Sequence, residues 1–105
     1  MADFMKMLQQ AQELQGRLQK VEQELAQQTV KASSGGGMVT VEANALGVVQ
    51  SIKIDPSAVV PGDVEMLEDL LLVAVTEAQK KAAELARQEM GKLTGGMGLP
   101  FQLPF

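Results

Sequence analysis

Apolar residues near the amino terminus recur at alternating intervals of three and four within an otherwise polar segment. Their positions are Phe4, Met7, Ala11, Leu14, Leu18, Val21 and Leu25. This spacing predicts a helix with a heptad stripe, beginning near Asp3 as N-cap. At 1.5 Å per residue the helix would be about 35 Å long. An ordinary core-facing helix and a coiled-coil-like arm both fit the stripe, and the pattern leaves the two alternatives open.

The period changes from 3.6 to 2 between Thr29 and Asp55. Residues 38–43 and 48–54 alternate in polarity on either side of a turn at 44–47 that contains Asn and Gly, which predicts a β-hairpin. Val30 and Ala32 indicate an earlier strand, joined to the hairpin by a flexible Ser/Gly connection at 33–37. The pair Asp55-Pro56 should end the last strand, because proline cannot donate to a ladder. We therefore expect a three-stranded antiparallel sheet with one buried face.

A second long helix is predicted after Pro61-Gly62, with Asp63 as N-cap and the acidic residues Glu65, Glu68 and Asp69 in its first turns. Gly95-Gly96 should stop it. Its expected buried stripe is Leu67, Leu70, Leu71, Ala74, Ala78, Ala82 and Leu85.

The second helix is apolar on nearly every side between Leu70 and Val75, and a three-stranded sheet can cover only one side. A second subunit is therefore expected to cover the other, which predicts a homodimer. The residues expected at the dimer interface are Leu67, Leu70, Leu71, Ala74, Val75 and Ala78. The predicted fold is α+β, with one domain over residues 1–95 and a flexible Gly/Pro/Phe tail over 96–105.

Composition removes several kinds of chemistry. The chain has no Cys and no His, so it lacks thiolate ligands, disulfides and the commonest general base. The Gly-rich segment 33–37 is not followed by the Lys-Ser/Thr of a phosphate-binding loop. The acidic residues at 63–69 suit a helix start better than a cation site, and Glu77 and Glu84 are expected to pair with Lys80 and Lys81. We expect no catalysis, no cofactor, no metal and no small-molecule substrate.

The amino terminus does not look like a signal peptide, and the longest apolar run, 70–75, is too short to span a bilayer. A cytoplasmic protein without membrane contact is expected. The formal net charge of −4 argues against indiscriminate binding to polyanions, since DNA affinity depends on Lys and Arg at phosphates.

Five segments together carry a family resemblance: the Gln-rich helix at 7–14, the strand at 37–41, the segments 52–56 and 65–71, and residues 82–90 followed by Gly-Met-Gly-Leu-Pro. In order, spacing and total length they resemble the YbaB/EbfC family of small bacterial nucleoid-associated proteins. The resemblance implies a homodimer whose long helices project as a tweezer-like pair. It also implies binding of double-stranded DNA with modest sequence preference, a place in the nucleoid and an influence on gene expression.

The resemblance points to DNA contact through the first and last helices. The cations available there are Lys6, Arg17, Lys20, Lys80, Lys81, Arg87 and Lys92. A dimer would present each set twice, so that local clusters rather than net charge meet the phosphates. The alternative is a protein-interaction module that uses the heptad helix, or the repeated Leu-Pro-Phe-like groups of the tail, without physiological DNA binding.

Overall fold

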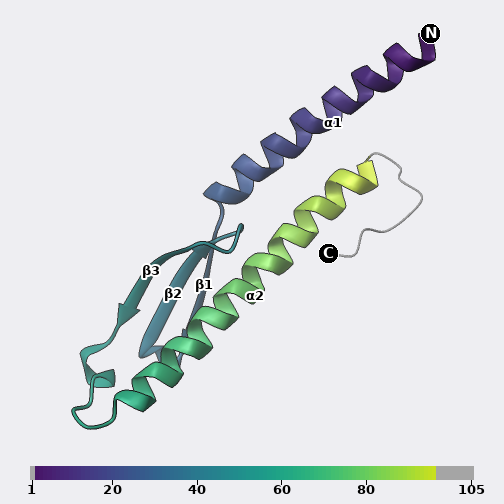
Figure 1. The fold of residues 1–105 in the computed structure, drawn as a ribbon. Coiled ribbons are helices and arrows are strands. Elements are labelled where there is room, and N and C mark those ends of the chain that lie inside the picture. Colours follow the sequence, from purple (N-terminus) through teal and green to yellow (C-terminus); the bar gives the residue numbers. More distant parts are fainter. Residues whose placement is uncertain (1, 97–105) are drawn as a thin grey trace.

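The computed structural model describes residues 2–96 (Figure 1). Helix α1 (Ala2–Gln27) is followed by strands β1 (Thr29–Ser34), β2 (Val39–Asn44) and β3 (Val49–Ile54), and helix α2 (Val64–Gly96) closes the chain. The strands form one antiparallel sheet in the order β1-β2-β3. This confirms the α+β fold, with its two long helices and three strands. The predicted tail lies outside the described residues, apart from Gly96.

One face of the sheet is apolar because cross-strand partners point to the same side. Ala32 pairs with Val41 and Val41 with Ile52, so three strands contribute to that face. α2 packs on it through alanines spaced by four, and Ala74, Ala78 and Ala82 are fully buried. Small side chains let the helix approach the sheet closely, which confirms the predicted buried stripe at these positions.

A β-bulge shifts the alternation in β3. Glu42 pairs with Ser51 but Ala43 pairs with Val49, so Gln50 is an extra residue. As a result Val49 packs against the core whereas Val48 is exposed. The unbroken alternation predicted for 48–54 is therefore wrong at its first residues.

α2 lies over β1 and β2 and leaves β3 uncovered (Figure 1). Ile52, on the same sheet face as the buried Val41, is 47% exposed, and its neighbour on that face, Ile54, is also exposed. Leu72 and Val75 lie on one flank of α2 together with Gln79, whose Nε2 donates to the Gly47 carbonyl in the β2–β3 turn at 3.3 Å. That flank therefore faces β3. We call the surface formed by Ile52, Ile54, Leu72 and Val75 the β3 strip.

The base of α1 is tied to the β2–β3 turn. The Ala45 amide donates to the carbonyls of Leu25 and Gln28, at 3.1 and 3.0 Å, and Leu25 is buried. The buried Asn44 holds the turn itself, because its Oδ1 accepts from the amides of Leu46 and Val48. This confirms the predicted turn and fixes the point at which α1 leaves the body.

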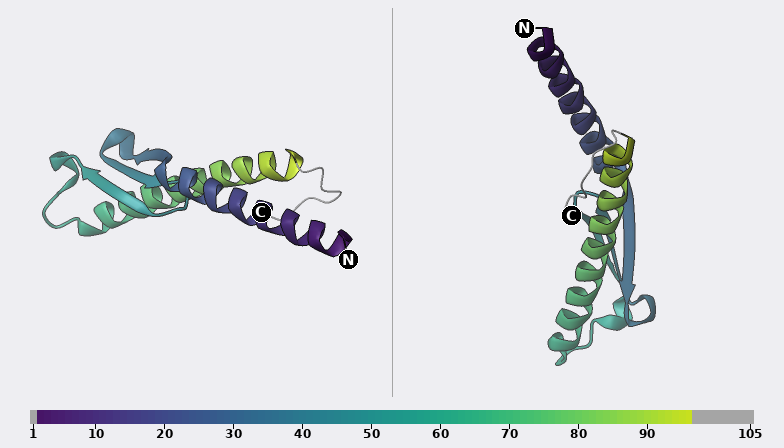
Figure 2. Two further views of the ribbon diagram at one scale, coloured as in Figure 1. Left: turned by 90° about the horizontal axis from the view of Figure 1, so that it is seen from above. Right: turned by 90° about the vertical axis from the view of Figure 1, so that its right-hand side faces the viewer.

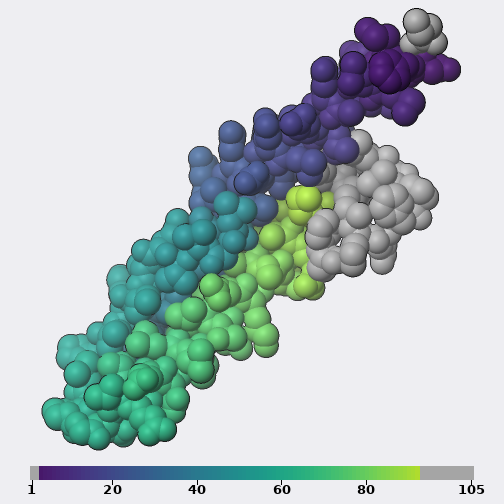
Figure 3. Space-filling view, in the orientation of Figure 1, coloured from purple at the N-terminus to yellow at the C-terminus, as the bar shows by residue number. Residues whose placement is uncertain are grey.

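Beyond this base α1 projects as an arm (Figures 2 and 3). Phe4 and Met7 are 66% and 67% exposed, so the core-facing alternative for the stripe is wrong over the outer part of the helix. The radius of gyration is 19.7 Å, against roughly 13 Å for a compact chain of this length. The accessible surface of 7533 Å² compares with roughly 5700 Å² for a compact monomer of this mass.

The Gly connection after β1 is an ordered 3₁₀ turn, Gly35–Gly37, rather than the flexible link that its composition suggested. Gly35 has a φ of 60°, and a Cβ built on it would lie 2.8 Å from Cδ2 of Leu70 on α2. The adjacent Ser34 hydroxyl donates to the Leu70 carbonyl at 2.6 Å. The turn thus fastens the sheet to the start of α2.

The start of α1 and the end of α2 each differ slightly from the predicted position. α1 begins at Ala2, so Asp3 lies in the first turn rather than at the N-cap, where its charge still suits the helix dipole. α2 includes Gly95 and Gly96, which were expected to stop it. Asp63 does cap α2, since its Oδ1 accepts from the Met66 amide at 3.2 Å.

A pair of alanine substitutions tests the close approach at the Gly turn. Gly35→Ala should lower the free energy of unfolding by about 2–3 kcal/mol, because it combines left-handed backbone strain with a clash against Leu70. Gly36→Ala, with a φ of 65° but nothing within 4 Å of the new Cβ, should cost only about 1 kcal/mol. Urea denaturation measures both, and equal losses would contradict the described contact.

Candidate nucleic-acid interface

Cations are absent from one end of the molecule. From Asp55 to Gln79 the sequence carries six carboxylates and no Lys or Arg. This segment forms the end of the molecule where α2 begins, whereas α1 and the later half of α2 point toward the opposite end (Figure 1). Those two helical parts carry the seven cations named from the sequence, so the candidate interface lies away from the acidic end.

The three cations of α1 are exposed, and among the residues that the structure describes none forms an ion pair. Lys6, Arg17 and Lys20 are thus free to meet phosphate without first breaking a contact within the chain. The helix that carries them stands clear of the body (Figure 3). An exposed cation on a projecting helix can reach a duplex that the body itself does not touch.

The cations of α2 are mostly paired within the helix. Lys80 pairs with Glu77 at 4.0 Å, Arg87 with Glu84 at 3.0 Å, and Lys92 with Glu89 at 3.4 Å. Each pair has a spacing of three residues and is solvent-exposed, so it is worth only a few tenths of a kcal/mol. A phosphate can therefore compete for these side chains, at a small cost.

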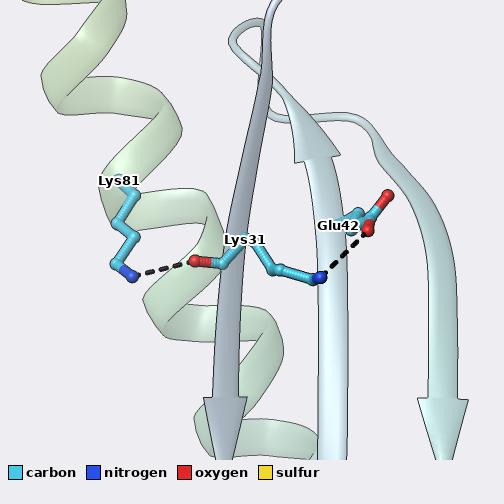
Figure 4. Close-up of polar contacts among 3 residues, drawn as sticks. All are labelled: Lys31, Glu42 and Lys81. Carbon is cyan, nitrogen blue, oxygen red and sulfur yellow. Dashed lines mark hydrogen bonds and ion pairs between the residues drawn. The ribbon is translucent and has the colours of Figure 1, made fainter.

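Lys81 has a different partner from the one predicted. Its Nζ donates to the Lys31 carbonyl on β1 at 2.8 Å, while the Lys31 ammonium lies 3.7 Å from a Glu42 carboxylate oxygen on β2 (Figure 4). The predicted pairing of Glu84 with a lysine is wrong, because Glu84 contacts Arg87. Lys81 thus fastens α2 to the free edge of the sheet, a role that the sequence pattern did not reveal.

The residues named for a dimer interface divide into two groups. Ala74 and Ala78 are fully buried against the chain's own sheet, and the others are half-buried beside the same core. Exposed apolar side chains on this part of α2 are those of Leu72 and Val73, and Ile52 and Ile54 are exposed on the nearby β3. Sequence reasoning missed these because only the packing of α2 on two strands shows that the third is uncovered.

Other kinds of site find little support in the described part of the chain. Residues 2–96 contain no group of three or more Asp or Glu side chains placed to hold a metal ion, and none of their helices is long and apolar enough to cross a membrane. The pKa of Asp55 is lowered because its carboxylate accepts hydrogen bonds from the Ser57 amide and hydroxyl. These hydrogen bonds close the turn after β3 and give the carboxylate a structural role. The strand itself ends at Ile54, as expected for Asp55-Pro56.

Comparison with known proteins identifies the family. The model of the YbaB/EbfC DNA-binding family matches residues 1–97, which is nearly the whole chain. The chain belongs to the YbaB/EbfC DNA-binding family. The family resemblance inferred from the sequence is thereby confirmed, and the family is described by DNA binding rather than by a reaction.

Relatives of this YbaB/EbfC chain are named as nucleoid-associated proteins. One from Gemmatimonas aurantiaca is 52% identical and is covered over 99% of its length by 98% of this chain. Another from Chloroflexus aurantiacus is 50% identical, with 87% of this chain covering 91% of it. The crystal structure of an uncharacterized Helicobacter pylori protein matches with a TM-score of 0.72 at 24% identity, over 89% of this chain and 94% of that one. The likeness to the solved structure concerns the fold.

Substitution of neighbouring lysines tests the assignment of Lys81. Lys81→Met should lower the free energy of unfolding by about 1 kcal/mol, because the Lys31 carbonyl loses a charged donor. Lys80→Met, which removes only an exposed pair within the helix, should change it by less than about 0.5 kcal/mol. Thermal denaturation of both variants measures the difference, and a larger loss for Lys80→Met would refute the assignment.

Proposed function

We propose that this protein is a homodimer that binds double-stranded DNA with modest sequence preference through its projecting helices. In this role it organises the bacterial nucleoid, influences gene expression from within the cytoplasm, and catalyses no reaction. The observation that carries the proposal is the separation of free cations on α1 from the acidic end of the molecule. Membership of a DNA-binding family and the names of the relatives support the same function.

The exposed apolar surface supports a homodimer. The chain exposes on the order of 1800 Å² more than a compact monomer of its mass, whereas a standard interface buries about 800 Å² per partner. The β3 strip includes Leu72 and Val75 of the apolar segment 70–75 of α2, for which the sequence led us to expect cover by a second subunit. A second copy seated there would complete the layer that α2 leaves unfinished over β3.

The arrangement of charge supports DNA contact by the helices. A dimer doubles each cation, and two arms can meet phosphates at separate points along a duplex. The net charge of −4 per chain repels the backbone at long range, so affinity should be moderate and fall steeply with salt. Two arginines on the helices, Arg17 and Arg87, offer few bidentate contacts to bases, which accounts for a modest sequence preference.

Fluorescence anisotropy with a labelled duplex tests DNA binding. The double variant Lys6→Gln/Lys20→Gln should weaken binding about tenfold or more at moderate salt, since each dimer loses four phosphate contacts. Its salt dependence should also become less steep. Lys31→Gln, which removes an exposed cation from the polar face of the sheet, is the control and should leave both quantities nearly unchanged. Equal losses in both variants would contradict the assignment to α1.

Absence of binding by the unaltered dimer, even at low salt, would reject the proposed function. It would favour the protein-interaction alternative, for which the exposed stripe of α1 offers a surface.

Two adjacent residues of α2 test the dimer surface. Leu72→Asp should convert the dimer to a folded monomer, because it places an unpaired charge in the proposed interface. Val73→Asp is the matched control, since Val73 is 51% exposed and points away from the flank that carries Leu72 and Val75. Light scattering gives the mass, and circular dichroism checks the fold. A dimer that survives Leu72→Asp, or dissociates only with Val73→Asp, would place the interface elsewhere.

A further inference from the structure

Gly16 lies in the middle of the projecting helix without a reason in the chain's own packing. Its backbone is helical, with no positive φ, and among the described residues nothing lies within 4 Å of a Cβ built on it. Alanine in its place would favour the helix, because glycine is one of the poorest helix formers. The missing side chain therefore points to something that approaches the helix from outside.

Long polar side chains frame Gly16 on the surface of α1. Its neighbours three and four residues away are Gln12, Glu13, Gln19 and Lys20, all of which are exposed. The gap between them opens on the side of the helix opposite the apolar stripe. We call this gap, with the four side chains around it, the Gly16 notch.

The two sides of the notch differ in chemistry. At about 100° of rotation per residue, Lys6, Arg17 and Lys20 fall on one side, within roughly 60° of each other. Gln12 and Gln19 fall on the other side. One side thus offers positive charge to phosphates, and the other offers amides that can both donate and accept hydrogen bonds.

We infer that the Gly16 notch admits the base edges of the DNA major groove, where Gln12 and Gln19 recognise adenine. This use of the notch rests on the proposed DNA binding, to which it adds the face of α1, the groove and the base. Helix α1 stands clear of the body (Figure 3), and the major groove is wide enough to admit a helix. Without a side chain at position 16 the helix can lie deeper in the groove. The two amides then reach the bases while the cations meet phosphates at the rim.

Glu13 favours base edges over phosphates as the occupant of the notch. Its carboxylate lies on the cation side, four residues before Arg17, and it forms no ion pair among the described residues. A phosphate held in the notch would be repelled by this charge. Base edges carry amino groups that can donate to carboxylate and amide oxygens. Glutamine in particular can hold N6 and N7 of adenine with two hydrogen bonds, and both atoms lie in the major groove.

Substitutions of Gly16 in the full chain test the close approach by fluorescence anisotropy with a labelled duplex. Gly16→Leu should weaken binding about tenfold or more, because the new side chain holds the amides away from the bases. Gly16→Ala should weaken binding about threefold even though it favours the helix. Ala11→Leu, which adds bulk to the opposite side of α1, is the control and should change binding less than about twofold. Equal effects of Gly16→Leu and Ala11→Leu, or tighter binding by Gly16→Ala, would overturn the inference.

A duplex with modified adenines tests the groove and the base. In 7-deazaadenine a C–H group replaces N7, while pairing with thymine is kept. The unaltered protein should bind the modified duplex about threefold or more weakly than the ordinary one, because the N7 acceptor is lost. Gln12→Leu/Gln19→Leu should bind both duplexes equally, whereas Lys6→Gln/Lys20→Gln should bind both more weakly and keep the difference. No difference in the unaltered protein, or one that persists in Gln12→Leu/Gln19→Leu, would refute recognition of adenine by these amides.

Failure of this inference differs from failure of the proposed function. If the unaltered protein binds neither duplex, the proposed DNA binding is rejected, and the role of the notch with it. If the unaltered protein binds both duplexes equally and Gly16→Leu behaves like Ala11→Leu, DNA binding stands and only the role of the notch is wrong.

Discussion

The packing of α2 on only two of three strands governs the rest of the structure. Alanines at 74, 78 and 82 bring the helix close to β1 and β2, where the side chains of Val39 and Val41 are completely buried. A helix held this close over one side of a small sheet cannot also cover β3. The chain therefore completes its own core with few large side chains and leaves Ile52 and Leu72 exposed. A second copy is the simplest way to bury these exposed apolar side chains, and this is the reason for the proposed dimer.

The same constraint explains the arm. Because α2 occupies the apolar face of β1 and β2, α1 contacts the rest of the chain mainly through its last turns. The contact is made at Leu25 and the β2–β3 turn. The rest of the helix projects with its cations free of ion pairs, while six of the chain's thirteen carboxylates lie between Asp55 and Glu77, toward the other end of the molecule. An acidic protein can in this way offer exposed, unpaired cations to DNA phosphates, in keeping with its membership of the YbaB/EbfC DNA-binding family.

Local patterns in the sequence predicted the features that depend on near neighbours: the two long helices, the hairpin around Asn44, the N-cap at Asp63 and the alanine stripe of α2. Features that depend on distant segments were not predictable in this way. The Gly35 turn is ordered by its contact with Leu70, and Lys81 finds a carbonyl on β1 fifty residues away. The bulge at Gln50 and the exposure of β3 likewise follow from register and packing. Among the cations, the sequence identified candidates but could not separate Lys6, Arg17 and Lys20, which form no ion pair among the described residues, from those engaged by neighbouring residues.

DNA binding by the projecting helices is tested most directly by the backbone amide NMR shifts of the unaltered protein, recorded on addition of a short DNA duplex. If the projecting helices bind DNA, perturbations will concentrate on α1, around Lys6 to Lys20, and on the later half of α2 from Lys80 onward. Residues 55–77, which carry six carboxylates and no Lys or Arg, should keep their shifts. Perturbations centred on that acidic segment or on the polar face of the sheet would contradict the claim that the projecting helices bind DNA.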